Sequence, residues 1–408
     1  MAGGIFTGAN PMYVPRELAY QLQDSGARVL ICAEASLETG LEAARMAGLP
    51  RERVFLFDDG LATFEGRGRG RDDLGVEHWT RLVVGEEEGK KFVWEELDAE
   101  GVKNTVATLN YSSGTTGVPK GVEITHRNYI SNAVQIEFQS ALDPKYEERK
   151  KRAKHLCFLP MYHAMAQTIF GINAMKQAIP VYVMPKFDFV QMLENVQRFR
   201  ITNLILVPPI VVAMSKDPRT RQYDLSSVEK VAAGAAPLGR EVCVELEKLW
   251  PQGKINVKQG WGMTEITCAA VGWPPHEFSG SFSVGELNAN LEAKIVDEEG
   301  NEVKQGERGE IWVRGPNVMK GYWRRPDATQ ETISPDGWLK TGDIAYVDKD
   351  RHFFIVDRKK VGIDIPSGNS STLLTPCFRS SLRSREIRSH LLSWKPFCLV
   401  TKQSPMPQ

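Results

Sequence analysis

Residues 111–121 have the sequence Tyr111-Ser112-Ser113-Gly114-Thr115-Thr116-Gly117-Val118-Pro119-Lys120-Gly121, which decides how the rest of the chain is interpreted. Glycines let the backbone approach a ligand closely, hydroxyls add donors that rotate to fit it, and Lys120 adds a charge suited to phosphate. The apolar run 106–111 predicts a buried strand, so the loop leaves the end of a sheet, where polyphosphates are commonly bound. It is not a Walker A loop, because no Gly-Lys-Ser/Thr follows at the required glycine spacing.

The composition is that of an ordinary globular protein. The chain has 408 residues, enough for two or three domains, and its 51 basic and 51 acidic residues give a formal net charge of zero. We therefore expect no nucleic-acid partner. We also expect no membrane span, since no apolar run approaches about 18 residues. Six scattered cysteines without Cys-x-x-Cys spacing favour a reducing compartment, which we expect to be the cytoplasm. The oligomeric state is not predicted.

Strands and helices alternate through the first 283 residues. Helical spacing at 15–24 and 36–47 alternates with apolar strands at 28–33 and 54–57, which predicts right-handed crossovers and a parallel sheet. We expect no strand before the first of these helices. A second parallel unit is predicted from a further series of strands and helices, namely strands 155–159, 180–184, 203–207, 228–232 and 254–258 with helices 164–176 and 188–198.

From residue 284 the pattern changes to shorter strands separated by turn residues, which predicts antiparallel β-structure. We therefore divide the chain into α/β subdomains at 1–283, a β-rich subdomain at 284–357 and a tail at 358–408. Residues 361–408 hold 6 basic and 2 acidic residues and show no sustained periodicity. This composition predicts a disordered tail, or a segment read from intron or out-of-frame sequence.

Five further motifs lie at the ends of predicted strands or on either side of the predicted hairpin 344–356: Pro160-Met161-Tyr162-His163, Gly234-Ala235-Ala236-Pro237-Leu238-Gly239, Gln259-Gly260-Trp261-Gly262-Met263-Thr264-Glu265, Thr341-Gly342-Asp343 and Asp357-Arg358-Lys359-Lys360. Open α/β sheets bind ligands outside the carboxyl ends of their strands. Pro237 is suited to the first position of a helix. Simpler interpretations stay open, because a lone histidine is more often structural and Asp343 could merely cap a turn.

Taken in order, the six motifs resemble the adenylate-forming (AMP-binding) superfamily, and within it acyl-CoA ligases of the 4-coumarate–CoA ligase type. The resemblance covers roughly residues 3–360. It implies an α/β fold: a large adenylate-forming N-terminal domain with parallel α/β subdomains and a small antiparallel β subdomain. It also implies that ATP converts an aromatic or medium- to long-chain carboxylic acid into acyl-AMP, with Mg²⁺ as cofactor, and that CoA then displaces AMP.

The resemblance assigns a role to each motif residue. The triphosphate of ATP would be held by Ser112, Ser113, Gly114, Thr115, Thr116 and Lys120, and Mg²⁺ by Thr116 and Glu265. The region that binds the adenine and the acyl group would be lined by Gly234, Ala235, Ala236, Gln259, Gly260 and Trp261. Asp343 would bind the ribose and Arg358 the nucleotide, while Lys186 matches a CoA-contacting position. The catalytic residues would be Thr264 at the α-phosphate, Glu265, and His163 as gate of the acyl pocket.

The chain departs from the family at both ends. Family members have several dozen residues before the segment that matches Gly3-Gly4-Ile5-Phe6. After Asp357-Arg358-Lys359-Lys360 they have a mobile C-terminal lid domain, carrying a lysine that assists adenylation. We therefore expect a chain truncated at both ends, with the lid missing and activity impaired. A catalytically inactive nucleotide- or acyl-binding remnant and an adenylation domain serving a carrier protein are the alternatives. Full-length family members can be peroxisomal, although Pro405-Met406-Pro407-Gln408 is no peroxisomal signal.

Overall fold

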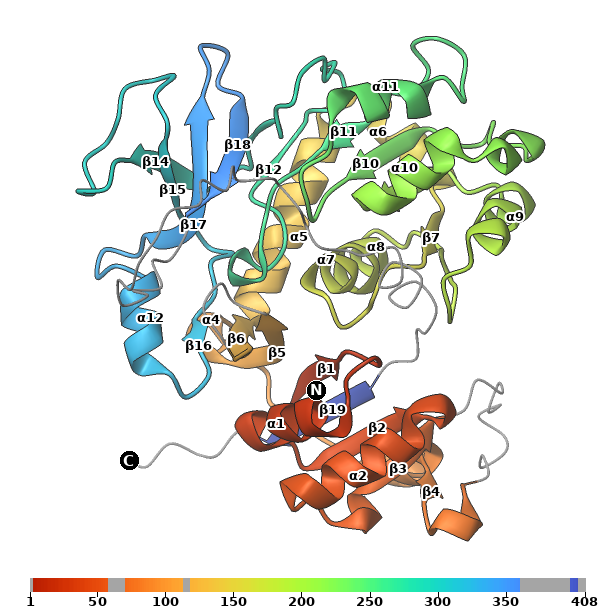
Figure 1. Ribbon diagram of the computed structural model, residues 1–408. Helices are drawn as coiled ribbons and strands as arrows, with labels where there is room; N and C mark the ends of the chain where they lie inside the picture. Colours follow the sequence, from red (N-terminus) through yellow and green to blue (C-terminus); the bar gives the residue numbers. More distant parts are fainter. Residues whose placement is uncertain (1–2, 58–69, 113–117, 360–396, 403–408) are drawn as a thin grey trace, which may run out of the picture.

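The computed structural model describes residues 3–57, 70–112, 118–359 and 397–402, the last of these as backbone only (Figure 1). The described residues confirm the predicted α/β fold class. They form an eight-stranded sheet, a five-stranded parallel sheet and a four-stranded antiparallel sheet. In Figure 1 the first sheet lies below, and helix α5 (His126–Ala141) runs between the other two. No helix in these ranges is long and apolar enough to cross a bilayer.

The eight-stranded sheet has the order β16-β6-β5-β1-β19-β2-β3-β4. Its strands β2 and β3 pair in parallel, as the strand–helix alternation predicts, and the helices α1 and α2 precede and follow β2. The bounds are β1 Gly4–Ala9, β2 Val29–Ala33, β3 Val54–Phe57, β4 Glu77–His78, β5 Val106–Ser112, β6 Lys120–Thr125, β16 Gly321–Tyr322, β19 Phe397–Lys402, α1 Pro15–Ser25 and α2 Leu37–Ala47.

The expectation that no strand precedes the first helix is wrong. Strand β1 pairs in parallel with β5, with Phe6 beside Thr108, and the Thr7 hydroxyl donates to the Leu109 carbonyl at 2.7 Å. The two glycines of β1 hide its alternation in the sequence, yet Gly8 has a packing reason, because a Cβ there would lie 2.8 Å from the Cβ of Tyr162. β1 therefore positions residues that face the site described below.

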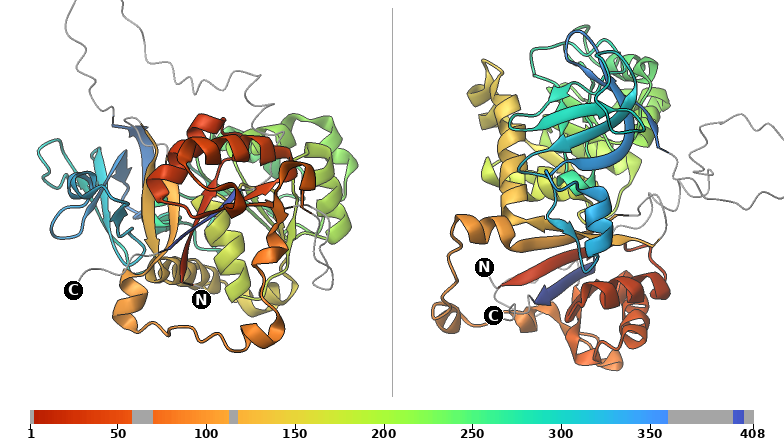
Figure 2. Two further views of the ribbon diagram at one scale, coloured as in Figure 1. Left: turned by 90° about the horizontal axis from the view of Figure 1, so that it is seen from below. Right: turned by 90° about the vertical axis from the view of Figure 1, so that its left-hand side faces the viewer.

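Strand β19 differs from the prediction of a disordered tail. Its backbone pairs antiparallel with β1 on one side and with β2 on the other, so it fills the place between them. Figure 2 shows β19 in dark blue beside the red β1. Residues 360–396 and 403–408 lie outside the described residues, and the prediction for them stays a prediction.

The five-stranded sheet is parallel throughout, as predicted, with the order β11-β10-β9-β7-β8. Its core is large and apolar, and includes Phe158, Leu193 and Leu204, which are almost completely buried. The bounds are β7 His155–Cys157, β8 Val181–Val183, β9 Asn203–Leu206, β10 Lys230–Ala233, β11 Lys258–Gln259, α9 Phe189–Phe199, α10 Pro208–Lys216 and α11 Arg240–Glu247.

Two helix predictions in this unit need correction. Helix α11 begins at Arg240 with Gly239 as its N-cap, so Pro237 belongs to the turn before the helix. The helix predicted at 164–176 is interrupted, since α7 (Ala164–Ala166) and α8 (Ala174–Lys176) flank the π-helical segment η5 (Gln167–Asn173). Such segments are rare and often lie at functional sites.

The antiparallel sheet has the order β14-β15-β17-β18, as predicted for this part of the chain. Between its strands β15 and β17, the chain forms β16, which pairs with β6 and ties this region to the first sheet. The bounds are β14 Glu292–Val296, β15 Gly309–Arg314, β17 Leu339–Val347 and β18 Phe353–Arg358, with β12 Val271–Gly272 and β13 Glu286–Leu287 as a separate pair. The remaining elements are α3 Glu86–Gly89, α4 Ala99–Asn104, α6 Tyr146–Arg152, α12 Pro326–Thr332, η1 Glu34–Ser36, η2 Arg51–Arg53, η3 Asp72–Leu74, η4 Trp79–Leu82, η6 Pro218–Gln222 and η7 Thr264–Ile266.

Candidate active site

A cavity of about 730 Å³ opens over the carboxyl ends of β9, β10 and β11. Ligands of open α/β sheets bind at this edge. Seven of the predicted site residues line it: His163, Gly234, Ala235, Gln259, Gly260, Trp261 and Thr264. Ala236 lies exposed in the same turn as Ala235 but is not part of the lining. The sequence-predicted adenine and acyl region is thus brought together in space.

The turn after β10 holds an unusual backbone conformation. Ala235 has φ +73°, in the left-handed region that residues with a side chain rarely adopt. The turn is fixed on both sides, because the Gly234 N–H donates to the Leu206 carbonyl at 3.2 Å and the Leu238 N–H donates to the Gln259 Oε1, also at 3.2 Å. Strain of this kind, held in place by its surroundings, is common at functional sites.

A chain of three polar side chains joins the cavity to the antiparallel sheet. The Nε1 of Trp261, a lining residue, donates to the Asp343 Oδ2 at 2.9 Å, and the Arg358 Nε lies 3.3 Å from the Asp343 Oδ1. Asp343 lies on β17 and Arg358 ends β18. Burial raises the pKa of Asp343, although Trp261 and Arg358 both oppose this effect. The carboxylate is therefore held by two donors at the edge of the cavity.

A second carboxylate joins the opening motif to the later one. The buried Glu265 accepts hydrogen bonds on Oε1 from the Ser112 hydroxyl and from the Tyr322 hydroxyl, both at 3.0 Å. The Lys120 Nζ lies 4.8 Å from the centre of the Tyr322 ring, and Lys120 pairs with Ser112 across β5 and β6. Ser112, Lys120 and Glu265 are thus brought together, as the motif order predicts. Ser113, Gly114, Thr115 and Thr116 lie outside the described residues.

Comparison with known proteins accounts for this arrangement. The family model described as "AMP-binding enzyme" matches residues 1–323. The chain belongs to this AMP-binding family. It is similar to 4-coumarate–CoA ligase 1 of Petroselinum crispum, with 35% identity over 369 residues, which are 88% of this chain and 62% of that protein. The chain therefore spans less than two thirds of the length of such relatives.

Solved structures agree with the family assignment. A long-chain-fatty-acid-CoA ligase from Archaeoglobus fulgidus matches with a TM-score of 0.69 and 27% identity, covering 86% of this chain and 66% of that one. ATP-bound MatB from Rhodopseudomonas palustris matches with a TM-score of 0.68 and 25% identity, covering 88% and 64%. The fold of this AMP-binding chain is therefore shared with a CoA ligase and with a protein solved with ATP bound.

In this member of the AMP-binding family, the predicted residue His163 lies at the cavity, whereas the predicted residue Lys186 lies away from it. His163 is the N-cap residue of α7, and its ring is accessible to the cavity and lies tilted against the Tyr162 ring at a ring-centre distance of 4.6 Å. Desolvation by the enclosing walls lowers the pKa of His163, so the ring is neutral at pH 7. Lys186 is exposed between β8 and α9 and does not line the cavity, although its neighbour Phe187 does.

Tyr322 is a site residue that the motifs did not indicate. Its hydroxyl donates to Glu265 and its ring lies under Lys120, so it joins two predicted phosphate-side residues. Burial raises its pKa, which keeps the hydroxyl protonated as a donor. In the sequence it stands in an ordinary Gly-Tyr-Trp run, and only the pairing of β16 with β6 brings it to the site.

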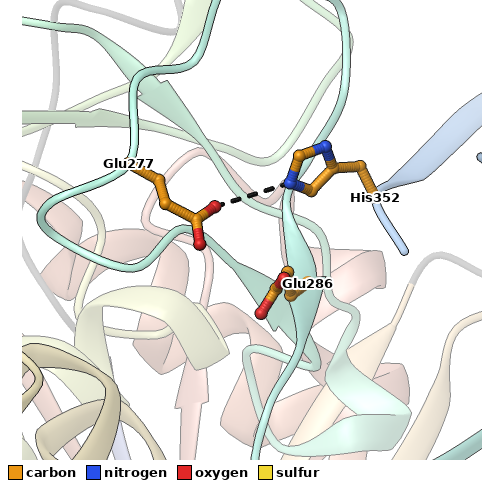
Figure 3. A group of neighbouring side chains, drawn as sticks. All are labelled: Glu277, Glu286 and His352. Atoms are coloured by element: carbon orange, nitrogen blue, oxygen red, sulfur yellow. Dashed lines mark ion pairs between the residues drawn. The ribbon is translucent and has the colours of Figure 1, made fainter. Parts of the chain in front are cut away.

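A group of potential metal ligands lies outside the cavity lining. Figure 3 shows Glu277, Glu286 and His352 converging from three segments, with ligand atoms that all lie within 4.8 Å of one another. A histidine nitrogen with two carboxylates suits a divalent cation. However, the His352 Nε2 lies 3.4 Å from the Glu277 Oε2, and this ion pair accounts for the contact by itself. We therefore assign no metal here.

Proposed function

We propose that the protein is an ATP-dependent acid–thiol ligase that activates a carboxylic acid and transfers the acyl group to CoA. In the first step a carboxylate oxygen attacks the α-phosphorus of ATP, the bond to the β-phosphate breaks, and acyl-AMP and pyrophosphate result. In the second step the CoA sulfur attacks the acyl carbon, AMP leaves, and the thiol proton is released. The observation that carries the proposal is the placement of Glu265 and Asp343, two carboxylates from different motifs, beside one cavity.

The phosphate side is built from the opening motif. Ser112, the segment 113–116 and Lys120 would hold the triphosphate, because phosphoryl transfer depends on positioning and charge neutralisation. Both hydroxyl donors of Glu265 bind Oε1, and Oε2 has no hydrogen bond from the part of the chain that the structure describes. This free oxygen fits a metal ligand, so Glu265 would hold Mg²⁺ together with Thr116. Bound Mg²⁺ would supply neutralising charge to the phosphates.

The nucleoside side is built from the two later motifs. Asp343 presents a carboxylate that would accept hydrogen bonds from the ribose hydroxyls, while Arg358 would contact the nucleotide. Small residues at Gly234, Ala235 and Ala236 leave room for a flat adenine against the backbone, with Gln259, Gly260 and Trp261 beside it. Thr264 would contact the α-phosphate, His163 would gate the acyl end, and Lys186 would contact CoA.

The domain division and location follow the same proposal. Residues 1–283 would supply the phosphate and acyl parts of the site, residues 284–357 the ribose contact, and Arg358, at the start of 358–408, a contact to the nucleotide. The similarity to 4-coumarate–CoA ligase 1 and to a long-chain-fatty-acid-CoA ligase supports an aromatic or longer-chain acid as substrate. We place the protein in the cytoplasm.

Exchange of labelled pyrophosphate into ATP tests the first step. Purified protein should catalyse exchange only when a suitable carboxylic acid is present, and adding CoA should then give acyl-CoA and AMP. An acid-free reaction is the control for contaminating exchange. Binding of ATP without acid-dependent exchange, over a broad panel of acids, would contradict the proposal and favour a nucleotide-binding protein.

A further inference from the structure

The cavity has a polar end that the nucleotide does not need. His155 on β7, Asn203 on β9 and Lys230 on β10 pair in register across three neighbouring strands. Side chains alternate between the two faces of a strand, so paired residues of parallel strands share a face, and all three line the cavity. They form a row of polar side chains across its wall, which we call the distal row.

The three side chains of the distal row lack polar partners in the part of the chain that the structure describes. No side chain of the three makes a hydrogen bond or ion pair within the ranges that the structure describes. His155 is 7% exposed, and its Nδ1 is buried without a partner. Buried polar groups of native proteins are nearly always satisfied, so the unpartnered Nδ1 of His155 is an exception, and it lies beside the half-buried Asn203 and the exposed Lys230 on the wall of the cavity. We take this combination as an indication of a ligand.

The charge balance at this end defines the chemistry of that ligand. Neighbouring charged groups are already paired, as the contacts Arg149–Asp143 at 2.9 Å, Lys150–Glu137 at 3.4 Å and Glu229–Arg152 at 2.6 Å show. Lys258 donates from Nζ to the carbonyls of Pro274 and Pro275 at 2.6 and 2.8 Å. Lys230 therefore faces the cavity without an ion-pair partner among the described residues. Desolvation by the enclosing walls, followed by the charge of Arg149, lowers the pKa of Lys230, and an anion bound in the cavity would favour its protonated form.

We propose that the distal row binds a second carboxylate, so that the acid activated by this protein is a dicarboxylate. This inference rests on the proposed ligase function, because it assigns the far end of that substrate. A carboxylate offers about four acceptor positions, and the row offers the ammonium of Lys230, the amide of Asn203 and a ring N–H of His155. Charge-assisted hydrogen bonds of this kind are about twice as strong as neutral ones.

The sheet also sets the length of the substrate. Lys230 is the first residue of β10, and Gly234 directly follows its last residue, four positions further along, which corresponds to about 13 Å of extended chain. Gly234 belongs to the nucleotide end, where the first carboxylate would react. The two carboxylates are therefore separated by a spacer of intermediate length, and a short diacid cannot reach both ends.

Matched unbranched acids test this inference. For each length from six to twelve carbons, the monocarboxylic acid, the ω-hydroxy acid and the dicarboxylic acid are compared by kcat/KM in acid-dependent pyrophosphate exchange. A site built to hydrogen-bond a group rejects the analogue that lacks it by about 10⁴–10⁵-fold, so at this accessible end of the cavity the dicarboxylate should exceed the monocarboxylate by about 10²-fold or more. Lys230→Met should abolish the preference, and Lys230→Arg should retain it. Lys216→Met, which changes an exposed lysine of α10, should leave it unchanged.

The outcomes separate this inference from the function on which it rests. Exchange with monocarboxylates at equal or better efficiency, or a dicarboxylate preference that survives Lys230→Met, would overturn the distal row as a carboxylate site while the ligase function stands. Absence of exchange with every acid would contradict the ligase function instead. Calorimetric titration of suberate into the wild type and Lys230→Met then tests the row directly: at least tenfold weaker binding to the variant supports it, and equal or absent binding to both overturns it.

Discussion

The strongest quantitative expectation concerns His155 and the stability of the protein in acid. Burial, followed by the nearby charge of Lys230, lowers the pKa of His155 from 6.5 to about 4. As the pH falls, the His155 ring is therefore protonated at a higher pH in the unfolded chain than in the folded one. The unfolded state binds more protons between these two values, so stability is present above pH 6.5 and is lost as the pH falls toward 4.

The size of the effect follows from the two pKa values. Each pH unit between them lowers the free energy of unfolding by about 1.4 kcal/mol, and integration from pH 7 to pH 5 gives a loss of about 2 kcal/mol. His155→Gln removes the titrating ring and should remove this part of the pH dependence. A loss of 2 kcal/mol is a large share of the roughly 5–15 kcal/mol by which a domain is stable.

Urea unfolding at pH 7, 6 and 5 measures the effect. The difference in free energy of unfolding between wild type and His155→Gln should change by about 2 kcal/mol over this range, because all other titrating groups are common to both proteins. His276→Gln is the matched control, since His276 is exposed and should show no such change. Parallel pH profiles for wild type and His155→Gln would refute the reasoning. If the variant does not fold, carbon-13 NMR titration of the His155 ring in wild type decides, and a pKa near 6.5 would contradict it.

Three further substitutions test the candidate active site and its packing. Glu265→Gln, which removes one preorganised charge, should lower acid-dependent pyrophosphate exchange by about 10²–10³-fold, measured at saturating ATP. Trp261→Phe deletes the indole donor to Asp343 and should raise the KM for ATP about tenfold, because a hydrogen bond to a charged group contributes about 1.5–3 kcal/mol. Gly262→Ala should lower the free energy of unfolding by about 1–3 kcal/mol in urea titration, since the added Cβ clashes with the Cys268 carbonyl group.

Each of these substitutions has a matched control. Glu245→Gln changes an exposed carboxylate of α11 and should leave exchange unchanged, whereas an equal loss in both glutamine variants would show that Glu265 has no special role. Trp79→Phe changes a tryptophan that does not line the cavity, and it should leave the KM for ATP as in wild type. Gly85→Ala adds a Cβ with nothing within 4 Å and should be tolerated, so equal destabilisation by both alanines would contradict the packing argument.

Much of the fold could be predicted from local pattern. The strands β7 and β9 follow from apolar runs, and the helix α9 from the helical spacing at 188–198. In the structure Asp188 caps this helix, since its Oδ1 accepts the Gln191 N–H at 2.8 Å. β1 was missed because Gly4 and Gly8 carry no side chain to mark the alternation. β19 was missed because its place between β1 and β2 depends on pairing between the two ends of the chain.

The position of a site residue could be predicted where its motif directly follows a predicted strand. The turn at Gly234 and the run at Gln259 follow strands directly, so their placement at the sheet edge could be read from the sequence. Tyr322 and the row of His155, Asn203 and Lys230 could not be predicted in this way. Their positions depend on which strands are neighbours and in which register they pair, and a single sequence does not specify either.

Transfer of oxygen from the acid to AMP tests the central claim most directly. If this chain activates its substrate as acyl-AMP, a carboxylic acid labelled with oxygen-18 in both carboxylate oxygens should deliver one labelled oxygen to the AMP released in the presence of CoA. Mass spectrometry of the nucleotide gives the result. AMP with one oxygen-18 per acyl-CoA formed is the expected outcome, and unlabelled AMP or label recovered in phosphate would contradict the account.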